Sequence, residues 1–294
     1  MTRRHSSARA LCVALLLGLS TLTGPALAET TTLAQLRQGT HIHGIAVDAK
    51  DPSRLYLATH HGFFLVSADG QASRLSEDRN DYMGFTPHPT DSTVLYASGH
   101  PAHGGNMGFL TSTDGGKTWQ QLSKGIHGPV DFHQMDVSAA DPKTVYGAYG
   151  GNLQVSKDGG RSWTLAGPAP EGLIDLAASP KEAERLYAAT KAGLLVSQNG
   201  GKEWSPATIF RGPASLVQAT PAGDVYAFIV GVGLLRKTEP NANWSRLGNG
   251  FGEDYLLHLA VDPTNPQNLY AVTQKSAILV SRDGGGTWAE FGAR

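Results

Sequence analysis

The chain is nearly free of cysteine: Cys12 is the single one among 294 residues. Without further thiols, disulfides cannot hold the fold together, and no thiolate is offered to a metal or to catalysis. Charged residues make up only 17% of the chain, against about 25% in an average domain. The formal net charge is −1 at pH 7, so the composition predicts no basic face for nucleic acid.

Long apolar runs are also missing, apart from a short one near the N-terminus. A basic start with Arg3 and Arg4 precedes an apolar stretch over 11–19, and Ala-Leu-Ala ends at Ala28. This pattern predicts a secretory signal peptide over 1–28, because the stretch is too short for a membrane anchor. We therefore expect a periplasmic or secreted protein with no membrane span. P-loop, G-x-G-x-x-G and G-x-S-x-G patterns are absent.

What the sequence does contain is a repeat of roughly 40 to 50 residues. The phrase (D)P-x-x-(L/V)-Y recurs with its tyrosine at Tyr56, Tyr96, Tyr146, Tyr187, Tyr226 and Tyr270. A second phrase, S-x-D-G-G-x-(T/S)-W, occupies 112–119, 156–163 and 281–288, with weaker copies at 197–204 and 237–244. Six such units predict four short strands each and an all-β fold, a six-bladed β-propeller over residues 41–294. Residues 29–40 form an N-terminal segment that can supply an extra outer strand.

The second phrase resembles the Asp-box, or BNR, repeat. Its aspartate can accept hydrogen bonds from a tight turn, its glycines tolerate positive φ, and its tryptophan can pack between neighbouring sheets. We therefore expect Asp114, Asp158 and Asp283 to form turns and to take no part in catalysis.

Aligning the units on their tyrosines brings chemistry-bearing residues into register. The innermost strands are then 41–48, 81–88, 131–138, 172–179, 214–221 and 255–262. His43, Met83 and His133 fall at one position in three successive units, and Asp81 and Asp131 lie two residues earlier.

The expected second strands end in further histidines. In a propeller, the first strand starts and the second strand ends at the same mouth of the channel, so these residues converge. The sequence predicts a metal site there, built from His41, His43, His60, His61, Met83, His100, His103 and His133. His88 is expected at a turn on the opposite face, and His258 is one register away from His43. Whether the cluster binds one ion or two stays open.

The ligand types indicate which metal to expect. Nine of the eleven histidines lie between His41 and His133, and the methionines other than Met1 fall in or next to this span, at Met83, Met107 and Met135. Imidazole and thioether without thiolate are the ligands that copper takes in an oxidising compartment. The expected cofactor is therefore copper, in a monomeric protein that sequesters, delivers or detoxifies the metal ion.

The phrases "HIHG", "THHGFF", "DYMGF", "SGHP", "GNMGF" and "DFHQM" resemble a subgroup of exported bacterial Asp-box proteins labelled glycosylhydrolase or exo-α-sialidase. The resemblance implies a sialidase-like glycoside hydrolase acting on envelope or extracellular glycans. Such sialidases use an arginine triad and a (F/Y)-R-I-P motif, and neither is found: the nearest phrase is "IFRGP" at 209–213, and the innermost strands contain no arginine.

Two alternatives to metal binding therefore remain open. A different glycosidase could use Asp81 and Asp131 as its two carboxylates. A propeller without enzymatic activity could instead bind an envelope protein through its loops.

Overall fold

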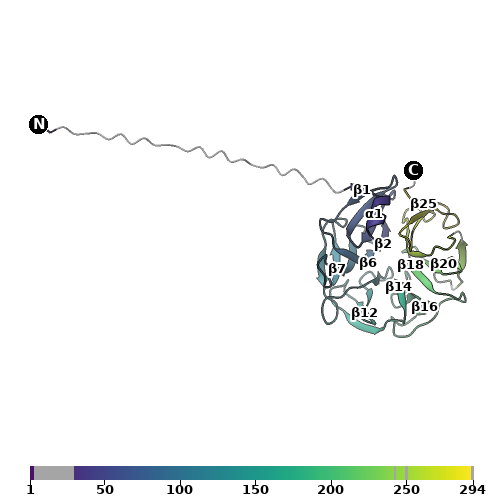
Figure 1. Ribbon diagram of the computed structural model, residues 1–294. Coiled ribbons are helices and arrows are strands. Elements are labelled where there is room, and N and C mark those ends of the chain that lie inside the picture. The colour runs from purple at the N-terminus through teal and green to yellow at the C-terminus, as the bar shows by residue number, and fades with distance from the viewer. Residues whose placement is uncertain (3–29, 242, 249–250, 293–294) are drawn as a thin grey trace.

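The computed structural model describes residues 1–2, 30–241, 243–248 and 251–292. Six antiparallel sheets follow one another in a ring, with the first strand of each sheet nearest the centre and later strands further out (Figure 1). The chain is thus a six-bladed β-propeller, as the repeats predicted. The predicted signal peptide lies outside the described residues, except for Met1 and Thr2.

The blades share one strand order. The innermost strands are β2 (Ile42–Val47), β6 (Asp81–Pro87), β10 (Gln134–Val137), β14 (Leu173–Ala178), β18 (Ala214–Ala219) and β22 (Leu256–Val261). The second strands are β3 (Arg54–Thr59), β7 (Leu95–His100), β11 (Val145–Tyr149), β15 (Leu186–Thr190), β19 (Asp224–Ile229) and β23 (Leu269–Thr273). The third strands are β4 (Gly62–Ser67), β8 (Phe109–Ser112), β12 (Asn152–Ser156), β16 (Gly193–Ser197), β20 (Gly233–Thr238) and β24 (Ile278–Ser281). The fourth strands are β5 (Gln71–Arg74), β9 (Gln120–Ser123), β13 (Thr164–Pro168), β17 (Ser205–Pro206), β21 (Ser245–Gly248) and β25 (Ala289–Glu290).

The hydrophobic core lies between neighbouring blades. Phe63 of β4, in blade 1, packs with Tyr82 of β6 and with Trp119, both of blade 2. The repeated tyrosines are part of these interfaces, and Tyr146 and Tyr187 are each only 1% exposed. Each blade therefore buries its faces against its two neighbours, as expected when a repeat cannot form a core alone.

The Asp-box aspartates form turns, as predicted. Oδ1 of Asp114 accepts hydrogen bonds from the backbone N–H groups of Lys117 and Thr118, and Asp158 and Asp283 act in the same way. These bonds lower the pKa of Asp158 to about 2. The motif also needs its second glycine: Gly160 has φ +86°, and a Cβ there would lie 2.1 Å from the Phe109 ring.

The N-terminal segment is only partly the outer strand that the sequence predicted. β1 (Thr30–Thr32) does add a fifth strand to blade 1, beside β5. The rest, however, forms α1 (Leu33–Gly39). The helix begins at a capping box between Thr32 and Gln35 and buries Leu33 and Leu36 on one side. The capping box and the spacing of the two buried leucines therefore favour a helix over a strand in this segment.

α1 also closes the ring. Blade 6 is built entirely from β22 to β25, and among the described residues no strand from the first part of the chain pairs with it. Instead, Leu33 and Leu36 lie in one hydrophobic cluster with Phe291 from the end of blade 6. Arg37 also forms an ion pair with Glu290, at 2.7 Å. The two ends are therefore joined by side-chain packing rather than by backbone pairing.

One innermost strand starts later than predicted. β10 begins at Gln134, so His133 precedes the strand. Phe132 is fully buried, and its backbone N–H donates to Oγ of Ser98 in blade 2. This contact pulls the chain away from β11 and leaves the His133 side chain at the channel mouth. Among the described residues, no helix is long and apolar enough to cross a membrane.

Candidate metal centre

The predicted histidines lie at one mouth of the channel, where second strands end and first strands start. The backbone N–H of His60, just after β3, donates to the carbonyl of His41, just before β2, at 3.3 Å. The two imidazole rings lie 5.6 Å apart. The predicted convergence of strand starts and strand ends is therefore present in the structure.

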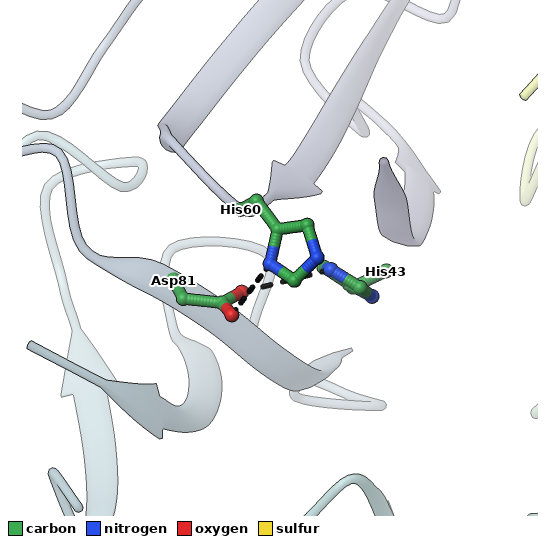
Figure 2. A group of neighbouring side chains, drawn as sticks. All are labelled: His43, His60 and Asp81. Carbon is green, nitrogen blue, oxygen red and sulfur yellow. Dashed lines mark hydrogen bonds and ion pairs between the residues drawn. The ribbon is translucent and has the colours of Figure 1, made fainter. Parts of the chain in front are cut away.

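Three residues of blades 1 and 2 form the first group, which we call cluster 1: His43, His60 and Asp81 (Figure 2). His43 comes from β2, His60 follows β3, and Asp81 starts β6 in the next blade. Nδ1 of His60 lies 2.6 Å from Oδ2 of Asp81. Because the carboxylate accepts this bond, Nδ1 carries the proton and Nε2 of His60 keeps its lone pair. In Figure 2 this second ring nitrogen points toward His43.

Cluster 1 contains two buried polar atoms that lack a hydrogen-bond partner. They are Nε2 of His43 and Oδ1 of Asp81, and they lie 3.6 Å apart. Two ligand atoms at about 2.1 Å from one ion, at a tetrahedral angle, are about 3.4 Å apart. The gap between these atoms therefore fits a small metal ion without rearrangement.

The surroundings of His43 keep its ring neutral. Burial, assisted by the nearby His60, His258, His133 and His41, lowers the pKa of His43 to about 3. At neutral pH its ring therefore has a lone pair on one nitrogen. A neutral imidazole is the form that binds metal ions.

Blades 2 and 3 form a second group, cluster 2, from His100, Asp131 and His133. One carboxylate oxygen, Oδ2 of Asp131, lies 2.8 Å from Nε2 of His100 and 2.5 Å from Nε2 of His133. The hydrogen bond to Asp131 raises the pKa of His133. The other oxygen, Oδ1 of Asp131, is buried without a hydrogen-bond partner.

The hydrogen bonds of His100 determine which of its ring nitrogens carries a proton in the neutral form. Its Nδ1 lies 2.7 Å from the carbonyl oxygen of Gly105, and a carbonyl can only accept, so Nδ1 donates. In a neutral ring Nε2 then carries no proton and can only accept a hydrogen bond. It faces Oδ2 of Asp131, which is also an acceptor. Only a proton between these atoms, or a metal cation that both atoms bind from one side, makes the contact favourable.

The other predicted ligands lie outside the two clusters. His41, His61 and His103 are exposed, and His61 lies beside His60 with 6.2 Å between ring centres. In the part of the chain that the structure describes, the convergent groups of His, Cys, Asp and Glu are clusters 1 and 2. Four of the residues of these two groups come from the predicted cluster of eight, and they are divided between two groups of three.

Both groups contain a carboxylate, which was not among the ligands predicted from the sequence. Met83 is buried in β6, at 8% exposure. The methionine that lines the channel beside His43 and His133 is Met135. Asp81 and Asp131, which the sequence analysis treated as weak catalytic candidates, supply the acidic member of each cluster. In the sequence, both aspartates lie two residues before the aligned positions of His43, Met83 and His133. This spacing could have indicated that they belong to the same site.

Two further histidines have positions that the sequence could only partly predict. His88 lies at a turn on the opposite face, where its Nδ1 accepts from the backbone N–H groups of Thr90 and Asp91, as expected. His258 lines the same channel cavity as His43 and His133, although it is one register away. Burial lowers the pKa of His258 to about 4.

Below the clusters, the channel narrows to a cavity of about 50 Å³ that also contains Asp136 and Asp175. Both carboxylates accept backbone N–H groups of the next blade: Asp136 from Ala178, and Asp175 from Val217. Burial raises the pKa of Asp136 to about 6 and that of Asp175 to about 7. These two residues link successive innermost strands and are not part of clusters 1 and 2.

Comparison with known proteins supports the fold and its repeat. The BNR/Asp-box repeat family matches residues 110–121, and no curated protein matches the chain. Together with the six blades, this match defines a β-propeller of the BNR type.

Solved structures share the fold at low sequence identity. The GH74 enzyme of Niastella koreensis is 16% identical with a TM-score of 0.60, over 86% of this chain and 45% of that one. The GH74 xyloglucanase of Xanthomonas campestris is 20% identical with a TM-score of 0.55, over 90% and 47%. YCF48 bound to D1 peptide is 20% identical with a TM-score of 0.52, over 89% and 84%. This chain thus spans less than half of either GH74 enzyme, and the likeness concerns the fold alone.

Proposed function

We propose that the channel mouth binds a divalent transition metal ion in cluster 1, with copper as the first candidate. The observation that carries this proposal is the pair of buried, unpartnered atoms, Nε2 of His43 and Oδ1 of Asp81, 3.6 Å apart. A buried polar atom without a partner is costly to the fold. An ion between the two atoms removes both costs at once.

The donor set favours the divalent ion over Cu(I). Cluster 1 offers two imidazoles and one carboxylate, and imidazole suits Cu(II), Zn(II) and Ni(II), whereas thioether favours Cu(I). Asp81 also orients His60 through Nδ1, as carboxylates commonly do for metal-bound histidines. Three protein ligands leave a coordination position open for water or an exchanging ligand. These features support a role in sequestration, delivery or tolerance of the metal.

Metal analysis of the purified protein tests this proposal directly. We expect a bound transition metal and competitive uptake of Cu²⁺ against a chelator of known affinity. His60→Gln should weaken uptake by cluster 1 at least about tenfold, since loss of even an outer partner of a metal ligand costs 10- to 100-fold. His88→Gln, a histidine on the opposite face, is the matched control and should bind like the wild type. Uptake that is weak and equal in all three proteins would refute metal binding at this site.

Glycoside hydrolysis is the second candidate function. It is favoured by the position of Asp81 and Asp131 at the starts of adjacent blades, on one mouth of the channel. Glycosidases need two carboxylates flanking the scissile bond, and two fold neighbours are GH74 enzymes. Both carboxylates contact histidines in this protein, which is the reason for ranking the metal first.

A glycan panel separates the two functions. Hydrolysis that survives chelation and is lost in Asp81→Asn or Asp131→Asn would establish the glycosidase. If the protein shows neither bound metal nor glycan turnover, the remaining hypothesis is a propeller that binds a protein. An envelope protein that co-purifies with the chain would then be sought.

A further inference from the structure

We propose that cluster 2 is a second metal site, filled independently of cluster 1 and exchanging its ion faster. This inference rests on the proposed function, because it assumes that cluster 1 binds a metal ion. It adds a stoichiometry of two and a division of roles: an inner, resident ion in cluster 1 and an outer, exchangeable ion in cluster 2.

The first support is that the two clusters share a histidine–aspartate pair that is repeated one blade apart. His60 and His100 each lie four residues after the repeated tyrosine of their blade, Tyr56 and Tyr96. Each reaches an aspartate of the next blade, Asp81 at the start of its innermost strand and Asp131 three residues before its innermost strand. A site that is repeated by the blade repeat predicts one ion for each copy.

The propeller itself does not require this histidine–aspartate pair. The other four blade junctions carry Gly150 with Gly172, Lys191 with Pro213, Val230 with Tyr255, and Gln274 with His41 at the matching positions. None of these pairs combines an imidazole with a carboxylate. The pair therefore occurs at two successive junctions for a reason other than folding, and metal binding is the chemistry that it offers.

The third ligands make the two sites separate. Cluster 1 takes His43 from the blade that supplies its first histidine, whereas cluster 2 takes His133 from the blade that supplies its aspartate. The two ligand sets have no residue in common. Each cluster also has its own buried, unpartnered carboxylate oxygen, on Asp81 and on Asp131. Two ions can therefore bind at the same time.

The solvent exposure of the ligands distinguishes the roles of the two clusters. In cluster 1, the side chain of His60 is 40% exposed, but those of His43 and Asp81 are each only 17% exposed, and His43 lines the channel cavity. In cluster 2, the side chains of His100 and His133 are 39% and 47% exposed. A chelator or a metal-accepting partner can replace these two nitrogens one at a time from solvent. The ion in cluster 2 should therefore leave faster.

Native mass spectrometry of the signal-free chain, loaded with Cu²⁺, tests the stoichiometry. We expect two ions on the wild type, one on His60→Gln, one on His133→Gln, none on the double variant and two on His88→Gln. One ion on the wild type that both single variants lose would show a single shared site, which refutes this inference and leaves the proposed function standing. No ion on the wild type would overturn both. His100→Gln repeats the cluster 2 test at a second exposed position, should His133→Gln fold poorly.

The rate at which excess EDTA removes the metal ions tests the assignment of a resident and an exchangeable ion. We expect two phases on the wild type, separated by at least tenfold in rate. The fast phase should be missing in His133→Gln, and the slow phase in His60→Gln. Equal rates for both ions, or the reverse assignment of the phases, would overturn the division into a resident and an exchangeable site.

Discussion

Asp81 and His100 are cross-strand partners, opposite each other in the antiparallel pair β6–β7, yet they belong to different clusters. Asp81 contacts His60 of blade 1, and His100 contacts Asp131 of blade 3. Blade 2 therefore supplies one ligand to each of its neighbours and connects the two candidate sites through its backbone. The two candidate metal sites therefore cover three of the six blades.

Metal binding should raise the thermal stability of the protein. An ion that binds only the folded state at 100 times its Kd contributes about 2.7 kcal/mol, and each kcal/mol raises the Tm of a chain of this size by about 2–4 °C. We therefore expect a rise of about 5–10 °C for each filled site with Zn²⁺, which is redox-inert. Differential scanning fluorimetry of the wild type and of the His60→Gln/His133→Gln double variant measures this rise. A rise of equal size in the double variant would contradict the assigned ligands.

The Asp-box carboxylates should matter for stability and not for metal uptake. Asp114→Ala removes the acceptor of two backbone N–H groups, and we expect the Tm to fall by a few degrees. Asp114→Asn should have a smaller effect, because Asn199 already fills this position in blade 4 and accepts from the N–H of Glu203. Both variants should bind Cu²⁺ like the wild type. A loss of uptake in either would assign the Asp-box a functional role.

The stability of the channel should depend on pH through Asp175. Its pKa is raised by burial from near 4 to about 7, so between these values the folded state holds a proton that the unfolded state has released. The contribution of this residue to stability therefore falls as the pH rises from about 4 to about 7. Asp175→Asn does not titrate, so the Tm of the variant minus that of the wild type should increase over this range.

Thermal unfolding of both proteins at each pH from 4 to 8 checks this sign. At the acidic end, Asp175→Asn should be the less stable protein, because an amide has one acceptor oxygen for the two N–H groups of Leu176 and Val217. A value of variant minus wild type that stays flat or falls as the pH rises would contradict a raised pKa for Asp175.

Ring closure should depend on packing more than on charge. Leu36 is 8% exposed and lies in one cluster with Phe291, and Leu36→Ala should lower the free energy of unfolding by about 2–5 kcal/mol. Arg37→Ala breaks the ion pair with Glu290, whose side chain is 55% exposed, and should cost less than about 1 kcal/mol. Urea unfolding of both variants measures which substitution lowers the free energy of unfolding more. A larger loss for Arg37→Ala would show that the ion pair closes the ring.

The fold could be predicted from the sequence because its determinants are local and repeated. An Asp-box sets its turn through bonds between residues two to four positions apart, such as those from Ser112 to Asp114 and from Thr118 to Asp114. The innermost strands were predicted to within a few residues, and the strand β10 differs because Phe132 is bound to a neighbouring blade. The helix α1 was missed, although its capping box at Thr32 and Gln35 is visible in the sequence.

The sequence by itself determined that six blades form and that histidines and aspartates gather at one channel mouth, because both follow from periodic positions along the chain. Only the tertiary structure decided that these residues divide into two groups, that Asp81 and Asp131 each belong to one of them, and that Met83 is buried. The reason is physical. Which atoms face one another depends on how neighbouring blades pack and on side-chain directions across a blade junction, and a repeat in one chain does not encode these distances.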